Sequence, residues 1–333
     1  MNNPKGLVNL GNTCYLNSAI QSIIHIPILQ EYFKDKFKNE VVESRKEFNF
    51  LIEFIKLLRA AQEENDIKVL KPLSFKKELG LLFSDYNGRD QHDSGEALAK
   101  ILDFLHDALS FKAIISVPEI GKDRETKLNH LAWKCMKEQY ESAYSFFVHN
   151  FYGQHKITMK CQVCQSLFYR FDPFMVLSLG IYESCNTIYD CFDKFQKIES
   201  LEEVNCETCN EKRNFKRQNN LWRVPKILLI SLNRYDMFGK KINRFIDFPT
   251  TNLQVNIAKK KYHDRISFDL VSVINHYGRL NGGHYTSFTK NKEGRWFEFD
   301  DDGVKEMKME RVVSDAAYFL VYQRKNLKTK MDF

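Results

Sequence analysis

The sequence lacks long apolar runs and blocks of like charge. Its apolar runs, such as Ile227 to Leu232, fall far short of the roughly 18 residues that a membrane span needs. Its 50 basic residues are interleaved with 43 acidic ones, so the net charge of +7 is spread over the chain and forms no nucleic-acid-binding arm. We therefore expect a soluble protein whose partners are neither membranes nor nucleic acids.

The sequence also lacks internal repeats, low-complexity tracts and glycine-rich or proline-rich linkers. With only 14 glycines and 7 prolines in 333 residues, it gives no sign of a flexible boundary between domains. Its hydrophobic content of 43% and aromatic content of 14% can fill a large core. We expect residues 1–333 to form one compact, monomeric domain with several lobes.

A secretory leader, with its charged and then apolar segment, is absent. Cysteines are nevertheless present, at positions 14, 135, 161, 164, 185, 191, 206 and 209. In a chain without a leader, they argue against a disulfide framework. We expect the protein to reside in the cytosol, the nucleus or both.

Hydrophobic periodicity changes along the chain. The first third has helical spacing, in 16–33, 48–58 and 96–109. Beyond about Phe146 the pattern is typical of strands, in 156–160, 226–232 and 266–273. Between the two regions, Gly121 to Glu125 is predicted to be a charged surface loop. The pattern favours an α+β fold.

Cys14 lies where the polar turn Gly11-Asn12-Thr13 meets the first helical segment. Asn12 and Thr13 are candidate capping residues, which would place Cys14 in the first turn of a helix. The helix dipole there lowers the pKa of a thiol and favours the nucleophilic thiolate. The alternative is a small, buried and inert cysteine.

A histidine and two aspartates lie on a predicted hairpin far downstream. Residues 282–290 and 295–302 are rich in aromatic and β-branched residues and flank a short polar turn with Gly294. Centring the turn between Lys292 and Glu293 places His284 opposite Asp301, with Asp300 one step away, to within about one residue. Such a pair suits a cysteine nucleophile, because the histidine takes the thiol proton and the carboxylate orients the ring. The alternative is a surface hydrogen bond with no catalytic role.

Four cysteines form two C-x-x-C pairs, Cys161 with Cys164 and Cys206 with Cys209. Two such pairs supply four thiolates, which form a closed structural zinc site if the intervening strands fold back. Chance pairs or a redox motif are the alternatives, although the latter would need a βαβ setting. Cys135, Cys185 and Cys191 lack this spacing and are predicted to be packing residues.

Taken together, these segments resemble the ubiquitin-specific proteases, which are papain-like cysteine deubiquitinases. The resemblance rests on the two cysteine pairs and on GLVNLGNTCYLNS (6–18), QHDSGEALAKILDFLHDAL (91–109), NGGHYTSF (281–288) and WFEFDDDGV (296–304). It extends from about residue 4 to residue 323. It implies a papain-like fold with a helical thumb (1–110), β fingers that hold zinc (mainly 145–235) and a β palm with the histidine (mainly 236–333).

The resemblance also implies a catalytic role for individual residues. Cys14 would be the nucleophile and His284 the general base, oriented by Asp300, with Asp301 as the alternative acid. Asn9, five positions before the cysteine, would donate its side-chain amide to the oxyanion. The expected partners are ubiquitin and ubiquitinated proteins, and the expected reaction is hydrolysis at the C-terminal glycine of ubiquitin through a thioester.

A further group of residues is expected to bind the ubiquitin tail. Gln91, Asp93, Glu96, His276, Gly283 and Tyr285 align with family positions along the tail channel, where acidic residues would grip an arginine. Helix capping by Asp93 and a dipole interaction of Glu96 are the alternatives. This chain departs from the family pattern at Gly95 and Ala97, which are usually bulkier, and in Leu232-Asn233-Arg234-Tyr235.

Three other functions stay open at this stage. The chain could process a ubiquitin-like modifier with the same catalytic residues. It could bind ubiquitin and cleave it weakly or not at all. It could also be a scaffold organised by zinc, in which case replacing Cys14 would change no activity.

Overall fold

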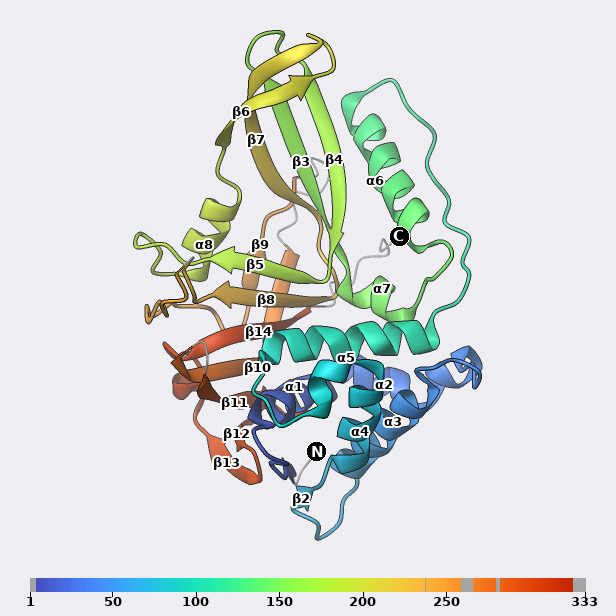
Figure 1. Ribbon diagram of the computed structural model, residues 1–333, viewed down its shortest axis with the longest axis vertical. Coiled ribbons are helices and arrows are strands. Elements are labelled where there is room, and N and C mark those ends of the chain that lie inside the picture. The colour runs from blue at the N-terminus through green and yellow to red at the C-terminus, as the bar shows by residue number, and fades with distance from the viewer. Residues whose placement is uncertain (1–3, 237, 259–265, 280–281, 326–333) are drawn as a thin grey trace.

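The structure is a computed structural model, and it describes residues 4–236, 238–258, 266–279 and 282–325. It has a helical lobe that lies beside a large palm sheet, and a smaller finger sheet that extends from them along the long axis of the molecule (Figure 1). This mixed α and β architecture confirms the predicted fold class. None of the helices in the described residues has both the length and the apolarity that crossing a bilayer requires.

The helical lobe contains the first five helices: α1 (Cys14–Ile24), α2 (Pro27–Asp35), α3 (Phe48–Gln62), α4 (Leu73–Leu82) and α5 (Ser94–Leu109). Two short 3-10 helices, η1 (Lys36–Glu40) and η2 (Ser84–Asn87), and the parallel pair β1 (Gly6–Leu7) and β2 (Val69–Leu70) complete it. The predicted helical segments 48–58 and 96–109 lie within α3 and α5. The segment 16–33 is divided, because Pro27 begins a new helix.

The palm sheet has eight strands among the described residues, in the order β13-β12-β11-β10-β14-β8-β5, with β9 paired to β10. These are β5 (Val176–Gly180), β8 (Ile227–Asn233), β9 (Leu253–Val255), β10 (Ile266–Arg279), β11 (Gly282–Lys290), β12 (Trp296–Asp300), β13 (Gly303–Met307) and β14 (Ala317–Arg324). All pairs are antiparallel except β5 with β8. The short 3-10 helix η3 (Met309–Arg311) precedes β14.

The two faces of the palm sheet carry separate hydrophobic cores because side chains alternate along each strand. On β8, Leu229 packs with the helical lobe, whereas Leu228 and Ile230 pack on the opposite face. Helix α8 (Ile188–Phe195) covers that opposite face through Ile188 and Phe192. The sheet is therefore buried on both sides, and α1 packs directly on β11.

The finger sheet has the strand order β4-β3-β7-β6. Its strands are β3 (Gly153–Cys161), β4 (Leu167–Phe174), β6 (Glu199–Cys206) and β7 (Glu211–Arg223), all antiparallel. Helix α7 (Phe146–Phe151) leads into it, and α6 (Arg124–Tyr140) stands beside it (Figure 1). Leu128 and Ala132 of α6 pack against Phe171 and Trp222 of the sheet.

The prediction of a surface loop over Gly121 to Glu125 is wrong at its end. Helix α6 begins at Arg124, because the carboxylate of Asp123 accepts hydrogen bonds from the backbone N–H groups of Glu125 and Thr126. Asp123 therefore caps the helix, and only the residues before Arg124 form the loop. The charged composition conceals a helix with one narrow apolar face, formed by Leu128, Ala132 and Met136.

Candidate active site

Cys14 is the first residue of α1, and only 3% of it is exposed. The backbone turns into the helix through Gly11 and Asn12, which have φ angles of 102° and 55°. Thr13 occupies the capping position, but its hydroxyl accepts a hydrogen bond from the Leu10 N–H group and caps nothing in the helix. The position of Cys14 in the first turn is confirmed, whereas capping by the Thr13 side chain is wrong.

The environment of Cys14 raises the pKa of its thiol. Burial is the main cause, and the nearby carboxylate of Asp301 acts in the same direction. A hydrogen bond from the Tyr285 backbone N–H group opposes the shift without reversing it. The expectation of a lowered pKa is therefore wrong, because desolvation outweighs the helix terminus. The thiol is protonated near neutral pH and needs a base.

His284 is the residue immediately before Tyr285 on β11. Its Nε2 atom lies 2.5 Å from Oδ1 of Asp300 at the end of β12. With the carboxylate accepting from Nε2–H, Nδ1 of the ring is available as a proton acceptor. The predicted hairpin exists, but its register differs by one residue, since Ser287 pairs with Phe299. The turn is centred on Glu293, and this shift favours Asp300 over Asp301 as the partner of His284.

Asp301 lies beside this pair but has other partners. Its Oδ2 accepts from the Asn9 side-chain amide and its Oδ1 from that of Asn17, both at 2.8 Å. Its backbone oxygen accepts from Leu7 N–H, and its φ angle is 52°. Asp301 therefore connects β1 and α1 of the helical lobe to the end of β12.

Asn9 also organises the loop before Cys14. Its side-chain oxygen accepts from the backbone N–H groups of Gly11 and Thr13, at 2.9 Å and 3.1 Å. Its NH₂ group donates one hydrogen to Asp301, which leaves a second hydrogen on the same nitrogen. The amide is thus held in place from both of its ends.

The residues predicted to line the tail channel gather between α5 and the palm sheet. Gln91 bonds both backbone groups of Gly283. Asp93 caps α5 through the Glu96 N–H group and also accepts a hydrogen bond from the Tyr318 hydroxyl. The capping alternative for Asp93 is therefore present, and Glu96 lies in the first turn with an exposed side chain.

His276 and Tyr285 form a buried aromatic pair in the same region, with their ring centroids 4.5 Å apart. Burial lowers the pKa of His276 to about 4, so the ring is neutral at physiological pH. The Tyr235 hydroxyl lies 3.0 Å from its Nδ1 atom. Gly95 has no room for a side chain, since a Cβ atom would lie 2.8 Å from the Phe319 ring. This departure from the family pattern therefore has a packing reason.

Three residues at the site were not predicted from the sequence. Asn17 is a polar residue within the apolar repeat of α1, and it is 2% exposed. A buried amide on an apolar helix face is a signal that could have identified it. Tyr235 and Tyr318 could not be distinguished from ordinary core tyrosines.

The four cysteines of the two C-x-x-C pairs come together at the tip of the finger sheet, with all four sulfurs within 4.8 Å of one another. The Sγ atoms of Cys164 and Cys206 are 3.6 Å apart, and those of Cys161 and Cys209 are 4.0 Å apart. These separations suit a tetrahedral thiolate site, whose metal–sulfur bonds of about 2.3 Å place the sulfurs roughly 3.8 Å apart.

The protonation of these thiols also fits a metal site. Hydrogen bonds from Ser166 lower the pKa of the Cys164 thiol to about 6, so it is a ready thiolate. Hydrogen bonding to Cys164 raises the pKa of Cys209, so the two thiols share a proton that a bound cation would displace. Cys185 and Cys191 are fully buried in the core behind the palm sheet, and Cys135 lies at the interface of α6 and β4. These three are packing residues, as predicted.

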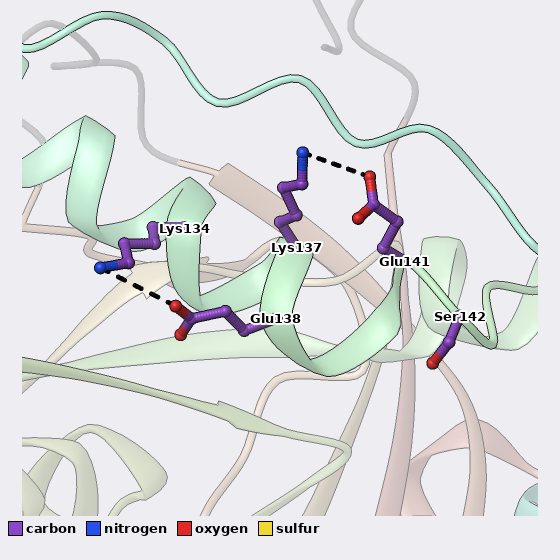
Figure 2. Close-up of a pocket in the computed structure, with 5 residues that line it drawn as sticks. All are labelled: Lys134, Lys137, Glu138, Glu141 and Ser142. Carbon is purple, nitrogen blue, oxygen red and sulfur yellow. Dashed lines mark ion pairs between the residues drawn. The ribbon is translucent and has the colours of Figure 1, made fainter.

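A cavity of about 420 Å³ lies away from these sites, on α6 (Figure 2). Its lining consists of Lys134, Lys137, Glu138, Glu141 and Ser142. Lys134 pairs with Glu138 at 3.8 Å and Lys137 with Glu141 at 3.4 Å, so its charges are compensated. It shares no residue with the region around Cys14.

The fold and the site define a class of protein. A helical lobe with a buried thiol at a helix start, packed on a sheet that bears a histidine–aspartate pair, is the architecture of papain-like cysteine hydrolases. The family model described as ubiquitin carboxyl-terminal hydrolase matches residues 5–322. The chain therefore belongs to this family.

Individual relatives agree with this assignment. The chain is 29% identical to a probable ubiquitin carboxyl-terminal hydrolase, R319, of Acanthamoeba polyphaga mimivirus, over 97% of this chain and 90% of the relative. It is 31% identical to ubiquitin carboxyl-terminal hydrolase Usp2 of Drosophila melanogaster, over 96% of this chain but only 34% of the fly protein. Among solved structures, it is similar in fold to a chain of the SAGA Ubp8/Sgf11/Sus1/Sgf73 DUB module bound to ubiquitin aldehyde, with a TM-score of 0.76 and 24% identity over 97% of this chain and 70% of that one.

Proposed function

We propose that this chain is a cysteine-type deubiquitinase, which hydrolyses peptide and isopeptide bonds at the C-terminal glycine of ubiquitin. The observation that carries the proposal is the neighbourhood of Cys14. Its sulfur accepts a hydrogen bond from the backbone of Tyr285, the residue after His284, and His284 is paired with Asp300. Membership of the family and the names of its relatives supply the substrate.

In this mechanism His284 removes the Cys14 proton, because burial keeps the thiol protonated. Asp300 holds Nε2, directs Nδ1 toward the sulfur and stabilises the imidazolium that forms. The thiolate attacks the carbonyl carbon of the terminal glycine. His284 then protonates the departing amine, and it later activates the water molecule that releases ubiquitin from the thioester.

The oxyanion of the tetrahedral intermediate would accept a hydrogen bond from the Asn9 amide and another from a backbone N–H group. Asp301 uses one hydrogen of the Asn9 NH₂ group, and the second can serve the oxyanion. In this proposal Asp300 is the acid that orients His284, and Asp301 orients the oxyanion donor.

The tail of ubiquitin would approach along the residues between α5 and the palm sheet. Glu96 offers an exposed carboxylate to an arginine of the tail, and Asp93 lies one turn before it. Gly283, His276 and Tyr285 would form the opposite wall. The neutral state of His276 leaves the channel without a positive charge from this residue.

Zinc is the metal that we propose for the four-cysteine cluster. Four thiolates leave no open coordination position, so zinc would connect β3 to the β6–β7 hairpin and take no part in catalysis. Metal analysis of the purified protein should find about one zinc per chain, and serine at Cys161 and Cys206 should abolish binding. Retention of zinc by that double variant would contradict the assignment.

We also propose that the chain acts as a monomer in the cytosol, the nucleus or both. None of its eight cysteines forms a disulfide, which suits a reducing compartment. Light scattering after gel filtration checks the oligomeric state, and a fluorescent fusion checks the location.

The test of the proposed activity is a reaction with ubiquitin vinyl sulfone, a probe that traps the nucleophile. The wild type should form an adduct on Cys14, Cys14→Ala should form none, and His284→Ala should react far more slowly. Parallel probes built on ubiquitin-like modifiers should react more slowly than the ubiquitin probe. If the ubiquitin probe binds but never reacts, the chain is a binding module. Faster reaction with a probe built on another modifier would show that this modifier, and not ubiquitin, is the substrate.

A further inference from the structure

Gly283 lies on β11 directly before His284, and a single side chain holds both of its backbone polar groups. Its N–H group donates to Oε1 of Gln91 at 3.1 Å. Its carbonyl oxygen accepts from Nε2 of Gln91 at 3.2 Å. The amide of Gln91, just before α5, thus contacts β11 as a neighbouring strand would.

At this contact, no strand among the described residues pairs with the outer edge of β11. The ladder between β11 and β12 begins at Ser287, which pairs with Phe299. On the inner edge, Gly283 faces Gly278 of β10. A Cβ atom on Gly283 would lie 2.3 Å from Nε2 of His276, so this part of the strand can be held only through its backbone.

The loop that carries Gln91 also contacts the segment before the candidate nucleophile. The side-chain amide of Asn12, two residues before Cys14, donates to the backbone oxygen of Arg89 at 2.9 Å. Asn12 has a φ angle of 55°, a conformation that asparagine tolerates better than most residues. The loop of residues 89–91 therefore connects the segment before Cys14 to the segment before His284.

We propose that Gln91 is a positioning residue that acts through Gly283, holding the His284 end of β11 at the correct place relative to Cys14. This inference rests on the proposed function. It differs from the sequence-based expectation that Gln91 binds the ubiquitin tail. Displacement of a catalytic group by about 1 Å can slow a reaction on the order of 100-fold, so two exposed hydrogen bonds can have a large effect on rate.

The experiment replaces Gln91 with methionine, which has a similar length but neither of the polar groups. With ubiquitin–rhodamine as substrate, we expect Gln91→Met to lower kcat by about 10-fold to 100-fold and to leave KM within about twofold. Gln91→Glu keeps the acceptor for Gly283 N–H and should recover part of kcat. Gln139→Met on the exposed face of α6 is the matched control and should behave as wild type.

A second measurement needs no ubiquitin. Iodoacetamide alkylates the Cys14 thiolate, and mass spectrometry of the Cys14 peptide follows its rate at pH 7. Because His284 must accept the thiol proton, Gln91→Met should slow this alkylation by about tenfold, and Gln91→Glu by less. If the wild type fails to cleave ubiquitin while the alkylation difference persists, the proposed function fails and the positioning role stands.

Three results would overturn the inference. A KM raised tenfold with unchanged alkylation would make Gln91 a substrate contact. A higher kcat/KM in Gln91→Met would show that the hydrogen bonds between Gln91 and Gly283 hinder the reaction and must break when substrate binds. Unchanged rates in both assays would remove any role for the contact. Unfolding midpoints show whether Gln91→Met is folded. If Gln91→Met is not folded, the same two assays on Gln91→Glu test the inference.

Discussion

At the scale of single residues, Asp300 and Asp301 are neighbours with different partners. Asp300 contacts His284 and is more than half exposed. Asp301 accepts hydrogen bonds from two amides of the helical lobe, and one of them, Asn17, is buried. We therefore expect the first aspartate to affect the reaction alone and the second to affect both stability and reaction.

Alanine at each of these positions should separate the two effects. Asp300→Ala should lower kcat by roughly 10²-fold to 10⁴-fold, because the imidazole loses its orienting carboxylate, and should leave the free energy of unfolding nearly unchanged. Asp301→Ala should lower the free energy of unfolding by about 1–3 kcal/mol, because the buried Asn17 amide loses its shortest hydrogen bond and keeps only two longer ones to backbone carbonyls. Kinetics and urea unfolding of both variants check this, and equal stability losses would contradict it.

Asn9→Ala tests the proposed oxyanion donor. One such donor contributes about 3 kcal/mol to the stabilisation of the transition state, so the variant should turn over roughly 10²-fold to 10³-fold more slowly on ubiquitin–rhodamine. The variant also loses the acceptor for Gly11 and Thr13 N–H groups. Asn9→Asp keeps that acceptor but lacks the donor, and it should be as slow as Asn9→Ala. An Asn9→Asp variant with wild-type turnover would remove Asn9 from the mechanism.

At this scale, the candidate residues could be predicted from the sequence more accurately than the environments of their side chains. Cys14 and His284 could be chosen from their chemistry and their place in the pattern, whereas the choice of Asp300 over Asp301 came from the family resemblance alone. The raised pKa of Cys14 could not be predicted, because it depends on burial by segments far away in the chain. The same is true of Asn17, whose partner Asp301 lies near the other end of the chain.

At the scale of elements, helix α8 illustrates how a local motif supports the palm sheet. The Thr187 hydroxyl accepts from Asp190 N–H, and the Asp190 carboxylate accepts from Thr187 N–H, which is a complete capping box. Thr187→Ala should lower the free energy of unfolding by about 1 kcal/mol without changing kcat. Thr187→Ser keeps the hydroxyl and should lose much less. Urea unfolding distinguishes them, and equal losses would indicate that the Thr187 methyl group matters instead.

The finger sheet should depend on the four-cysteine cluster. Cys161 ends β3 and Cys206 ends β6, so a shared metal would join strands whose tips have little core of their own. We expect Cys206→Ser to lower the unfolding temperature by several degrees and to make the tip sensitive to proteolysis. The control is Cys135→Ser, which leaves the cluster intact. An unchanged unfolding temperature and proteolysis pattern in Cys206→Ser would show that the metal adds no stability.

Element types were easier to predict than their limits and register. The segments 48–58 and 96–109 are helical because their apolar periodicity matches the buried faces of α3 and α5. The hairpin register was displaced by one residue, because the turn chemistry of Asn291 to Arg295 allows more than one centre. Helix α6 was missed since its apolar face is narrow and its start depends on a single capping aspartate.

At the scale of the whole molecule, the site exists because two lobes meet. Helix α1 packs on β11, and a buried hydrogen bond joins Ser22 to Ser272 across the interface. Neither periodicity nor composition indicates this contact, which only the family resemblance implied. Buried polar groups at the interface also couple the stability of the molecule to pH.

His25, at the end of α1, is fully buried against Phe299, and burial lowers its pKa from 6.5 to about 4. In the unfolded chain it binds a proton below about pH 6.5, whereas in the folded protein it does so only near pH 4. Its contribution to stability is therefore present above pH 6.5 and is lost as the pH falls toward 4. Between pH 7.5 and 5.5 this loss should be about 1 kcal/mol.

His25→Asn measures this contribution, because asparagine keeps a donor for the Gln21 carbonyl and cannot titrate. His155 and His276, whose pKa values are also lowered to about 4 by burial, remain in both proteins and cancel in the comparison. Urea unfolding at pH 7.5 and 5.5 should show that the free energy of unfolding falls by about 1 kcal/mol less in the variant. Equal losses in both proteins would mean that His25 is already protonated in the folded state, and that α1 is less tightly packed on the palm sheet than its burial indicates.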